Sequence, residues 1–173
     1  MSQPPEPVNS NSLSHVTPDG RARMVDVGEK LVSARWAKAQ GIVRISSELE
    51  SRIRENTVAK GSVLEVARLA GILAAKRTDE LIPLCHTLPL DAIDLTAEIE
   101  PGFIRVTATV RTQSRTGVEM EALTAVAVAC LTVIDMGKAV DKAMVIDDIR
   151  MLEKHGGRGG SYVATPSSKG QGQ

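Results

Sequence analysis

The most constraining feature of this chain is a run without charged residues that extends from Ala122 to Ile134. Glu119 and Glu121 precede the run, and Asp135 and Lys138 follow it. A helix without charge along its middle has no face suited to water, so the pattern predicts a buried central helix. Because its ionisable groups lie at the two ends, we expect the chemistry of the protein there.

Length and composition narrow the class of protein. A chain of 173 residues fits one domain with its own core. Its formal net charge is zero and its aromatic content is 2%, which leaves neither a broad basic surface nor a set of stacking rings for nucleic acid. We expect no nucleic-acid partner, and a small anionic ligand held by a few lysines fits better. Cys85 lies in a loop beside His86, whereas Cys130 lies in the middle of the uncharged run, so no disulfide framework is indicated.

The chain ends and the apolar segments bear on location. The N-terminus lacks the basic start and apolar stretch of a secretory signal. We also expect no segment to reach the roughly 18 to 20 apolar residues that span a bilayer, so we predict a cytoplasmic protein without a membrane partner. Residues 1–22 and 164–173 are too polar to order themselves. They are predicted to be a disordered N-terminal arm and C-terminal tail around one domain, 23–163.

Three capping-box patterns predict helix starts. In such a box, a Ser or Thr side chain and a glutamate three residues later bond each other's backbone amides. The pattern occurs at Ser47-x-x-Glu50, Ser62-x-x-Glu65 and Thr116-x-x-Glu119. Each occurrence stands directly before a helical pattern of apolar residues.

Alternating apolar residues predict the strands. Residues 31–38 and 42–45 resemble two short strands, and 93–99 with 106–110 predict an antiparallel hairpin around a Pro-Gly turn. A last apolar stretch at 145–152 adds an edge or return strand. The order β, α, α, β, β, α, β predicts a ferredoxin-like α+β fold, an antiparallel sheet with helices packed on one face.

Basic residues gather in loops and at helix ends, namely Lys60, Lys76, Arg77, Lys138, Lys142 and Lys154. Glycines beside some of them let backbone amides approach an anion, which suits a phosphate site. The same cations also complement the carboxyl ends of helices, which is common. The sequence leaves both interpretations open.

The segment 81–90 places Cys85 and His86 side by side in an apolar loop with two prolines. A nucleophilic pair, half of a metal site and a ligand-contacting loop are the three alternatives. The other histidines, His15 and His155, give no metal-ligand spacing, so we predict no metal site. Neighbours in sequence rarely form a catalytic pair. A ligand-contacting loop is therefore preferred over a structural histidine.

The ends of the central helix carry the remaining candidates. Glu119 occupies the third position of its capping box, whereas Glu121 has no such local role. Asp135 and Lys138 share a helix face, and partial desolvation there would make them a usable base and acid. Glu121 and Asp135 are fourteen positions apart, about 21 Å along a helix. If both belong to one kind of site, two subunits must build it.

Several longer motifs carry a family resemblance. The runs 24–27, 74–78, 81–86, 116–125 and 135–140 closely resemble the cyclic pyranopterin monophosphate synthase (MoaC) family of molybdenum cofactor biosynthesis. The resemblance covers roughly residues 24–163. The family usually has a proline directly after its Cys-His pair, where this chain has Thr87.

The resemblance implies a pyrophosphate-releasing lyase. Its substrate would be 3',8-cyclo-7,8-dihydroguanosine 5'-triphosphate and its product cyclic pyranopterin monophosphate. It also implies a ferredoxin-like fold in a homohexamer, a trimer of dimers with active sites at subunit interfaces. No cofactor is required by the sequence, and Mg²⁺ could accompany the triphosphate. The alternative is a non-catalytic paralogue that binds a guanine nucleotide or a pathway partner.

The resemblance also assigns site residues. Asp135, Lys60 and Lys138 match the catalytic positions. The substrate-binding positions are matched by Leu84, Cys85, His86, Glu119, Met120, Glu121, Arg35 and Lys154.

Overall fold

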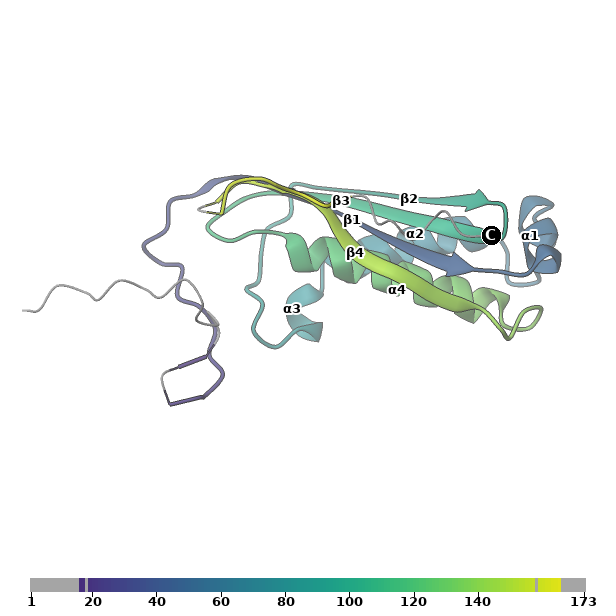
Figure 1. Ribbon diagram of the computed structural model, residues 1–173, viewed down its shortest axis with the longest axis horizontal. Helices are drawn as coiled ribbons and strands as arrows, with labels where there is room; N and C mark the ends of the chain where they lie inside the picture. The colour runs from purple at the N-terminus through teal and green to yellow at the C-terminus, as the bar shows by residue number, and fades with distance from the viewer. Residues whose placement is uncertain (1–15, 18, 158, 166–173) are drawn as a thin grey trace, which may run out of the picture.

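The computed structural model describes residues 16–17, 19–157 and 159–165, and its centre is one antiparallel sheet (Figure 1). The strand order is β2-β3-β1-β4-β5. The bounds are β1 Ser33–Arg44, β2 Ala92–Glu100, β3 Phe103–Ser114, β4 Val145–His155 and β5 Tyr162–Val163. The predicted hairpin is confirmed as β2 and β3, and the predicted last strand as β4.

The helices pack on one side of this sheet (Figure 1). Their bounds are α1 Ser47–Arg54, α2 Val63–Ala75, α3 Thr78–Leu81 and α4 Glu119–Gly137. Without the short α3 and β5, the elements follow the β-α-β-β-α-β order of the ferredoxin-like arrangement, with α1 and α2 together in the first crossover. The prediction of an α+β fold with helices on one face of an antiparallel sheet is confirmed.

Helix α4 forms the centre of the core. Ala122, Ala125, Val126, Ala129 and Val133 are completely buried, so the prediction of a buried central helix is confirmed. The expectation that no segment is long and apolar enough to span a bilayer was wrong. Among the described residues, only the 19-residue α4 is long and apolar enough to meet that criterion. Its contacts with the sheet explain this composition, because a helix buried in a protein core needs an apolar surface.

The predicted helices exist, but their first residues differ. Helix α1 is capped by Ser46, whose hydroxyl accepts from the Leu49 amide, and Ser47 is already helical. Ser62 stands at the N-cap of α2 without a side-chain capping bond. Helix α4 begins at Glu119, so Thr116 does not cap it. The three capping boxes therefore located the helices to within a few residues but predicted the wrong capping contacts.

The first strand differs from the two short strands predicted around Gln40-Gly41. Strand β1 runs without interruption through both residues and pairs with β3 along its whole length. Gly41 lies where α4 crosses the sheet, and a Cβ atom there would be 2.6 Å from Cγ1 of Val126. The glycine therefore permits close packing of strand and helix and does not mark a turn.

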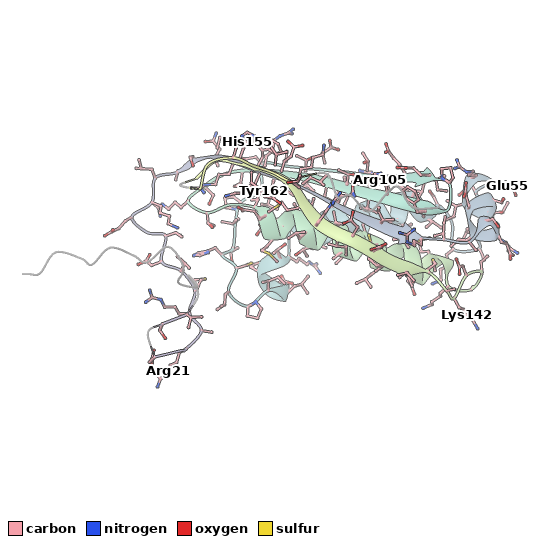
Figure 2. All side chains as sticks on the ribbon, in the orientation of Figure 1. Arg21, Glu55, Arg105, Lys142, His155 and Tyr162 are labelled. Atoms are coloured by element: carbon pink, nitrogen blue, oxygen red, sulfur yellow. The ribbon has the colours of Figure 1, made fainter. Side chains whose placement is uncertain are left out.

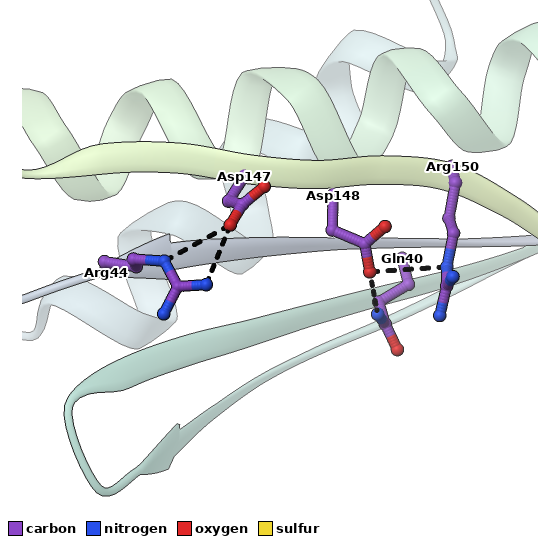
Figure 3. A network of polar contacts seen from close by, with 5 residues as sticks. All are labelled: Gln40, Arg44, Asp147, Asp148 and Arg150. Carbon is purple, nitrogen blue, oxygen red and sulfur yellow. Dashed lines mark hydrogen bonds and ion pairs between the residues drawn. The ribbon is translucent and has the colours of Figure 1, made fainter. Parts of the chain in front are cut away.

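Polar contacts and a bulge join β1 to β4 (Figure 3). Asp148 has a positive φ of 54°, and the pairing register shifts between Gln40 and Ile42. The carboxylate of Asp148 accepts from Nε2 of Gln40 and lies 3.3 Å from Nε of Arg150. The bulge thus places the Asp148 carboxylate where it accepts a hydrogen bond from Gln40 and forms an ion pair with Arg150.

The predicted chain ends lie largely outside the described residues. Of the predicted N-terminal arm, the described residues 16–17 and 19–22 form a turn that Val16 and Ala22 close by an isolated β-bridge. Of the predicted tail, only residues 164–165 are described. The disorder predicted for both ends therefore stays a prediction.

Packing between α2 and α4 depends on Gly71. A Cβ atom there would be 2.7 Å from the backbone oxygen of Ala125. We expect Gly71→Ala to lower the free energy of unfolding by roughly 1 to 3 kcal/mol through overpacking. Urea denaturation would measure this change in the free energy of unfolding. Leu69→Ala on the same helix is a control with a smaller expected effect, because the side chain of Leu69 is 49% exposed. A Gly71→Ala protein as stable as the wild type would contradict this close packing.

Candidate active site

A cavity of about 370 Å³ lies beside the amino-terminal end of α4. Its walls come from the segment before β1, the loop after α3 and the first turn of α4. The residues that line it are Val25, Val27, Lys30, Leu84, Cys85, His86, Leu88, Thr116, Gly117, Glu119, Met120 and Glu121. The structure therefore brings together six of the eight predicted substrate-binding residues.

Hydrogen bonds at Cys85, His86 and Thr87 hold the loop that contains them. The Cys85 amide donates to the carbonyl of Ile82. Nε2 of His86 lies 2.9 Å from the carbonyl oxygen of Val25, so it donates a hydrogen there. The histidine thus joins the loop to the segment before β1 and also lines the cavity, so it has a structural role while its predicted contact with a ligand stays a prediction.

Cys85 is not set up as a nucleophile. Burial raises the pKa of its thiol, and the nearby carboxylates of Glu121 and Asp79 raise it further. A thiolate is the reactive form of cysteine, and this environment disfavours it. Cys85 lines the cavity, and its predicted contact with a ligand stays a prediction.

Glu121 is the most unusual ionisable group of the cavity. Its side chain is buried, with 4% exposure. Burial raises the pKa of its carboxyl to about 7, with smaller contributions from the charges of Glu119 and Asp79. A carboxyl that titrates near neutrality can both donate and accept a proton under physiological conditions. The third residue of α4 therefore has acid–base chemistry that an exposed glutamate lacks.

Glu119 takes a different position from that predicted. It is the first residue of α4, not the third position of a capping box. A Cβ atom on Gly117 would lie 1.8 Å from Oε2 of Glu119, so the carboxylate lies over this glycine. Oε1 of Glu119 is 3.7 Å from Nζ of Lys154, which brings the predicted Lys154 to the rim of the cavity.

Arg35 lines a neighbouring cavity of about 440 Å³. Its Nε donates to the carbonyl of Ser114 at 2.9 Å, which fixes the side chain beside β3. Gly157 lies against the guanidinium, since a Cβ atom there would be 2.3 Å from Nη1 of Arg35. Lys30 lines both cavities, so they adjoin at this side chain.

The other three predicted residues meet at the carboxyl end of α4. Nζ of Lys138 lies 2.6 Å from Oδ1 of Asp135, and Nζ of Lys60 lies 2.8 Å from Oδ2. Lys60 also donates to the backbone carbonyl of Asp135. One carboxylate thus holds two ammonium groups from separate parts of the chain.

The prediction that Asp135 and Lys138 are partly desolvated was wrong for the single chain. The side chains of Asp135 and Lys138 are 58% and 60% exposed. Hydrogen bonds from Lys138 and Lys60 lower the pKa of Asp135 to about 2. Such a carboxylate is a weak base, and its clear effect is to orient two ammonium groups.

The two groups of residues are well separated within one chain. Figure 2 shows Lys142, just beyond α4, and His155, at the end of β4, at opposite ends of the body. Glu121 and Asp135 lie on the same continuous helix, fourteen positions and about 21 Å apart. Within the described part of the chain, no cluster of three His, Cys, Asp or Glu side chains could hold a metal ion.

Comparison with known proteins identifies the family of the chain. The MoaC family model matches residues 24–157. The chain belongs to the MoaC family. A relative from Methylobacterium sp. (strain 4-46) is 56% identical over 159 residues, which cover 90% of this chain and 99% of the relative. It is named cyclic pyranopterin monophosphate synthase.

Other MoaC relatives carry the same name. One from Cereibacter sphaeroides (strain KD131) is 54% identical over 157 residues, or 90% of this chain and 99% of the relative. One from Streptomyces griseus subsp. griseus is 51% identical over 155 residues, or 90% and 88%. The resemblance inferred from the motifs is confirmed.

Sequence reasoning missed part of the cavity in this MoaC chain. Val25, Val27 and Lys30 form one wall, although none was assigned a role. The motif 24–27 could have indicated this wall, because it was part of the family resemblance but its residues had been given no chemical role. Its apolar residues form the wall, and Lys30 follows three residues later.

The raised pKa of Glu121 predicts a pH-dependent stability. A folded-state pKa raised from 4.5 to about 7 gives a contribution that is complete below pH 4.5 and is lost as the pH rises through 7. Its size is on the order of 3 kcal/mol. Between pH 5 and 8, wild type should lose this stability relative to Glu121→Gln in urea denaturation.

The exposed Glu48 on α1 provides a matched control for this comparison. Glu48→Gln should keep the pH dependence of the wild type. If Glu121→Gln keeps it as well, Glu121 does not titrate as described.

Proposed function

We propose that this protein is a cyclic pyranopterin monophosphate synthase of molybdenum cofactor biosynthesis. It converts 3',8-cyclo-7,8-dihydroguanosine 5'-triphosphate to cyclic pyranopterin monophosphate and releases pyrophosphate, which makes it a lyase. The observation that carries the proposal is identity of 51 to 56% to synthases over 90% of the chain. The two groups of side chains at the ends of α4 support it.

In this proposal, the lysines at the carboxyl end of α4 bind the phosphate oxygens of the substrate and stabilise their negative charge. A triphosphate carries several negative charges, and the departure of pyrophosphate adds charge to the leaving oxygens. Lys60 and Lys138 supply ammonium donors whose positions Asp135 already fixes at 2.8 and 2.6 Å. Such preorganised donors stabilise developing charge without further rearrangement.

The amino end of α4 receives the ring of the substrate. His86, Cys85 and Met120 line the cavity beside Glu121. A carboxyl with a pKa of about 7 suits proton transfer to or from a ring nitrogen or oxygen during ring opening and closure. Glu121 is therefore the candidate for this proton transfer, and His86 for orienting the ring.

A complete site requires two subunits. One small substrate cannot contact both ends of a 19-residue helix, about 28 Å long. A symmetric oligomer solves the problem when the amino end of one α4 approaches the carboxyl end of another. We propose a homohexamer, a trimer of dimers, with active sites at the interfaces. The cytoplasm is the proposed location, no resident cofactor is required, and Mg²⁺ would arrive with the triphosphate.

Turnover of the cyclic intermediate tests the proposed activity. Purified protein should release pyrophosphate and form the pterin product. Lys138→Ala should lower the rate by at least about 100-fold, the scale of losing one charge-stabilising donor. Lys142→Ala should be close to wild type, because this exposed lysine four residues later makes no ion pair within the described residues. Nucleotide binding without product would favour the non-catalytic paralogue.

Mixed oligomers test the shared site. Glu121→Ala and Lys138→Ala chains damage opposite ends of α4, so co-expression with different tags should restore some intact sites. Random assembly gives about a quarter of the wild-type activity when each site uses one end from each subunit. Asp135→Asn with Lys138→Ala should restore none, because both substitutions damage the same end. Equal inactivity of the two mixtures would reject the shared site.

A further inference from the structure

Asp141 is a buried carboxylate just beyond the carboxyl end of α4, with 8% exposure. Its Oδ2 accepts from the Ser46 amide at 2.7 Å, and its Oδ1 accepts from the Ala143 amide at 2.9 Å. Burial alone would raise the pKa of this carboxyl, but the hydrogen bonds from Ser46 and Ala143 bring it below its ordinary value. The group is therefore ionised at neutral pH, and two backbone donors compensate its buried charge.

The bond between Asp141 and Ser46 joins two parts of the chain that are 95 positions apart. Ser46 is the N-cap of α1, and its hydroxyl accepts from the Leu49 amide at 3.3 Å. Asp141 belongs to the turn after α4, where its own amide donates to the carbonyl of Gly137 at 3.0 Å. One carboxylate therefore ties the first turn of α1 to the turn that follows α4.

Apolar packing supports the same contact between the two helices. Helix α1 lies at the end of the molecule where α4 finishes (Figure 1). Leu49 of α1 is completely buried, and a Cβ atom on Gly137 would be 2.7 Å from its Cδ2. The same Cβ atom would be 3.2 Å from Cε of Met144. Gly137 thus leaves room for Leu49, and one polar and one apolar contact together set the position of α1 against α4.

The position of α1 determines where Lys60 lies, because Lys60 is in the turn that connects α1 to α2. In this turn the Gly61 amide donates to the carbonyl of the buried Val58 at 2.9 Å. From there, Nζ of Lys60 donates to Oδ2 and to the backbone carbonyl of Asp135, both at 2.8 Å. A displacement of α1 would move Lys60 away from Asp135. Lys138 would keep its bond, because it is the C-cap of α4 itself.

We propose that Asp141 is a positioning residue for the site at the carboxyl end of α4. By accepting from the Ser46 amide, it holds α1 where Lys60 stays against Asp135. Asp141 touches no substrate and acts through Lys60. The inference rests on the proposed function for the use of Lys60 at phosphate oxygens. A misplacement of about 1 Å in a reacting site can lower the rate by about 100-fold, so loss of this bond affects turnover as well as stability.

Asp141→Asn tests this role in the full chain, because the amide group of asparagine keeps the shape but presents a donor to one of the two backbone amides. The Asp135 carboxyl should then lose its bond from Lys60, and its titration midpoint should rise from about 2 toward the ordinary 3.8. NMR of labelled aspartate carboxyl groups measures the midpoint, and Asp135→Asn identifies the signal. The kcat should fall by about tenfold or more.

Ser46→Pro removes the same bond from the donor side. A proline has no amide hydrogen, and the φ of −74° at Ser46 lies within the range that proline adopts. The Asp135 midpoint should rise in this variant as well. It keeps the test open if Asp141→Asn does not fold or if its side chain retains the bond to Ser46.

Two controls separate positioning from a general loss of stability. Gly71→Ala weakens the packing of α2 on α4, and Asp94→Asn removes one exposed carboxylate from β2. Both should keep the Asp135 midpoint and the kcat of the wild type. A merely structural role of Asp141 would lower the free energy of unfolding, as Gly71→Ala does, and leave the midpoint unchanged.

A double substitution tests the route through Lys60. Lys60→Ala alone should raise the Asp135 midpoint, and Asp141→Asn should add little in that background, because the bond it weakens is already absent. The proposal is overturned if neither Asp141→Asn nor Ser46→Pro raises the midpoint. It is also overturned if the rise is as large in the Lys60→Ala background as in the wild type.

The NMR measurement is independent of turnover, so the two proposals can fail separately. An active wild type whose Asp135 midpoint is unchanged in Asp141→Asn and Ser46→Pro would reject the positioning role and leave the synthase activity intact. An inactive wild type whose midpoint rises through Lys60 in these variants would reject the activity and retain the control of Lys60 by Asp141.

Discussion

Close packing of α4 on β1 is the contact on which the rest of the molecule depends. Gly41 lets the strand approach the helix, because any side chain there would collide with Val126. The small residues Ala122, Ala125 and Ala129 complete the buried face. Such packing requires a helix without charges along its middle. Every charged residue of α4 is therefore near an end, and the fold itself separates the two halves of the proposed site.

The two ends of α4 shift the pKa values of their carboxyl groups in opposite directions. At the amino end, burial without a cationic partner raises the pKa of Glu121 to about 7. At the carboxyl end, two lysines lower the pKa of Asp135 to about 2 while solvent still reaches it. The first environment favours proton transfer, and the second favours a fixed arrangement of positive charge. The proposed reaction needs both, since it reorganises a ring and releases pyrophosphate.

The sequence predicted elements that depend on periodicity and missed contacts that depend on tertiary structure. The uncharged run predicted α4, and alternation predicted the β2–β3 hairpin. Capping positions failed because Ser47 and Thr116 match the pattern while other backbone positions start the helices. The exposure of Asp135 depends on which segments pack beside the helix end, which no local pattern encodes. Lys30 was missed because it lines two cavities that exist only after folding.

Thr87 shows how this chain holds the loop with Cys85 and His86 in place without the proline that the family resemblance implies there. A proline would restrict the backbone directly after His86. Here the hydroxyl of Thr87 donates to the carboxylate of Asp79 on α3, which ties the loop to a neighbouring helix. The same carboxylate raises the pKa values of Cys85 and Glu121. The side-chain bond therefore holds the loop and also fixes a negative charge near the proposed proton-transfer residue, two effects that a proline would not combine.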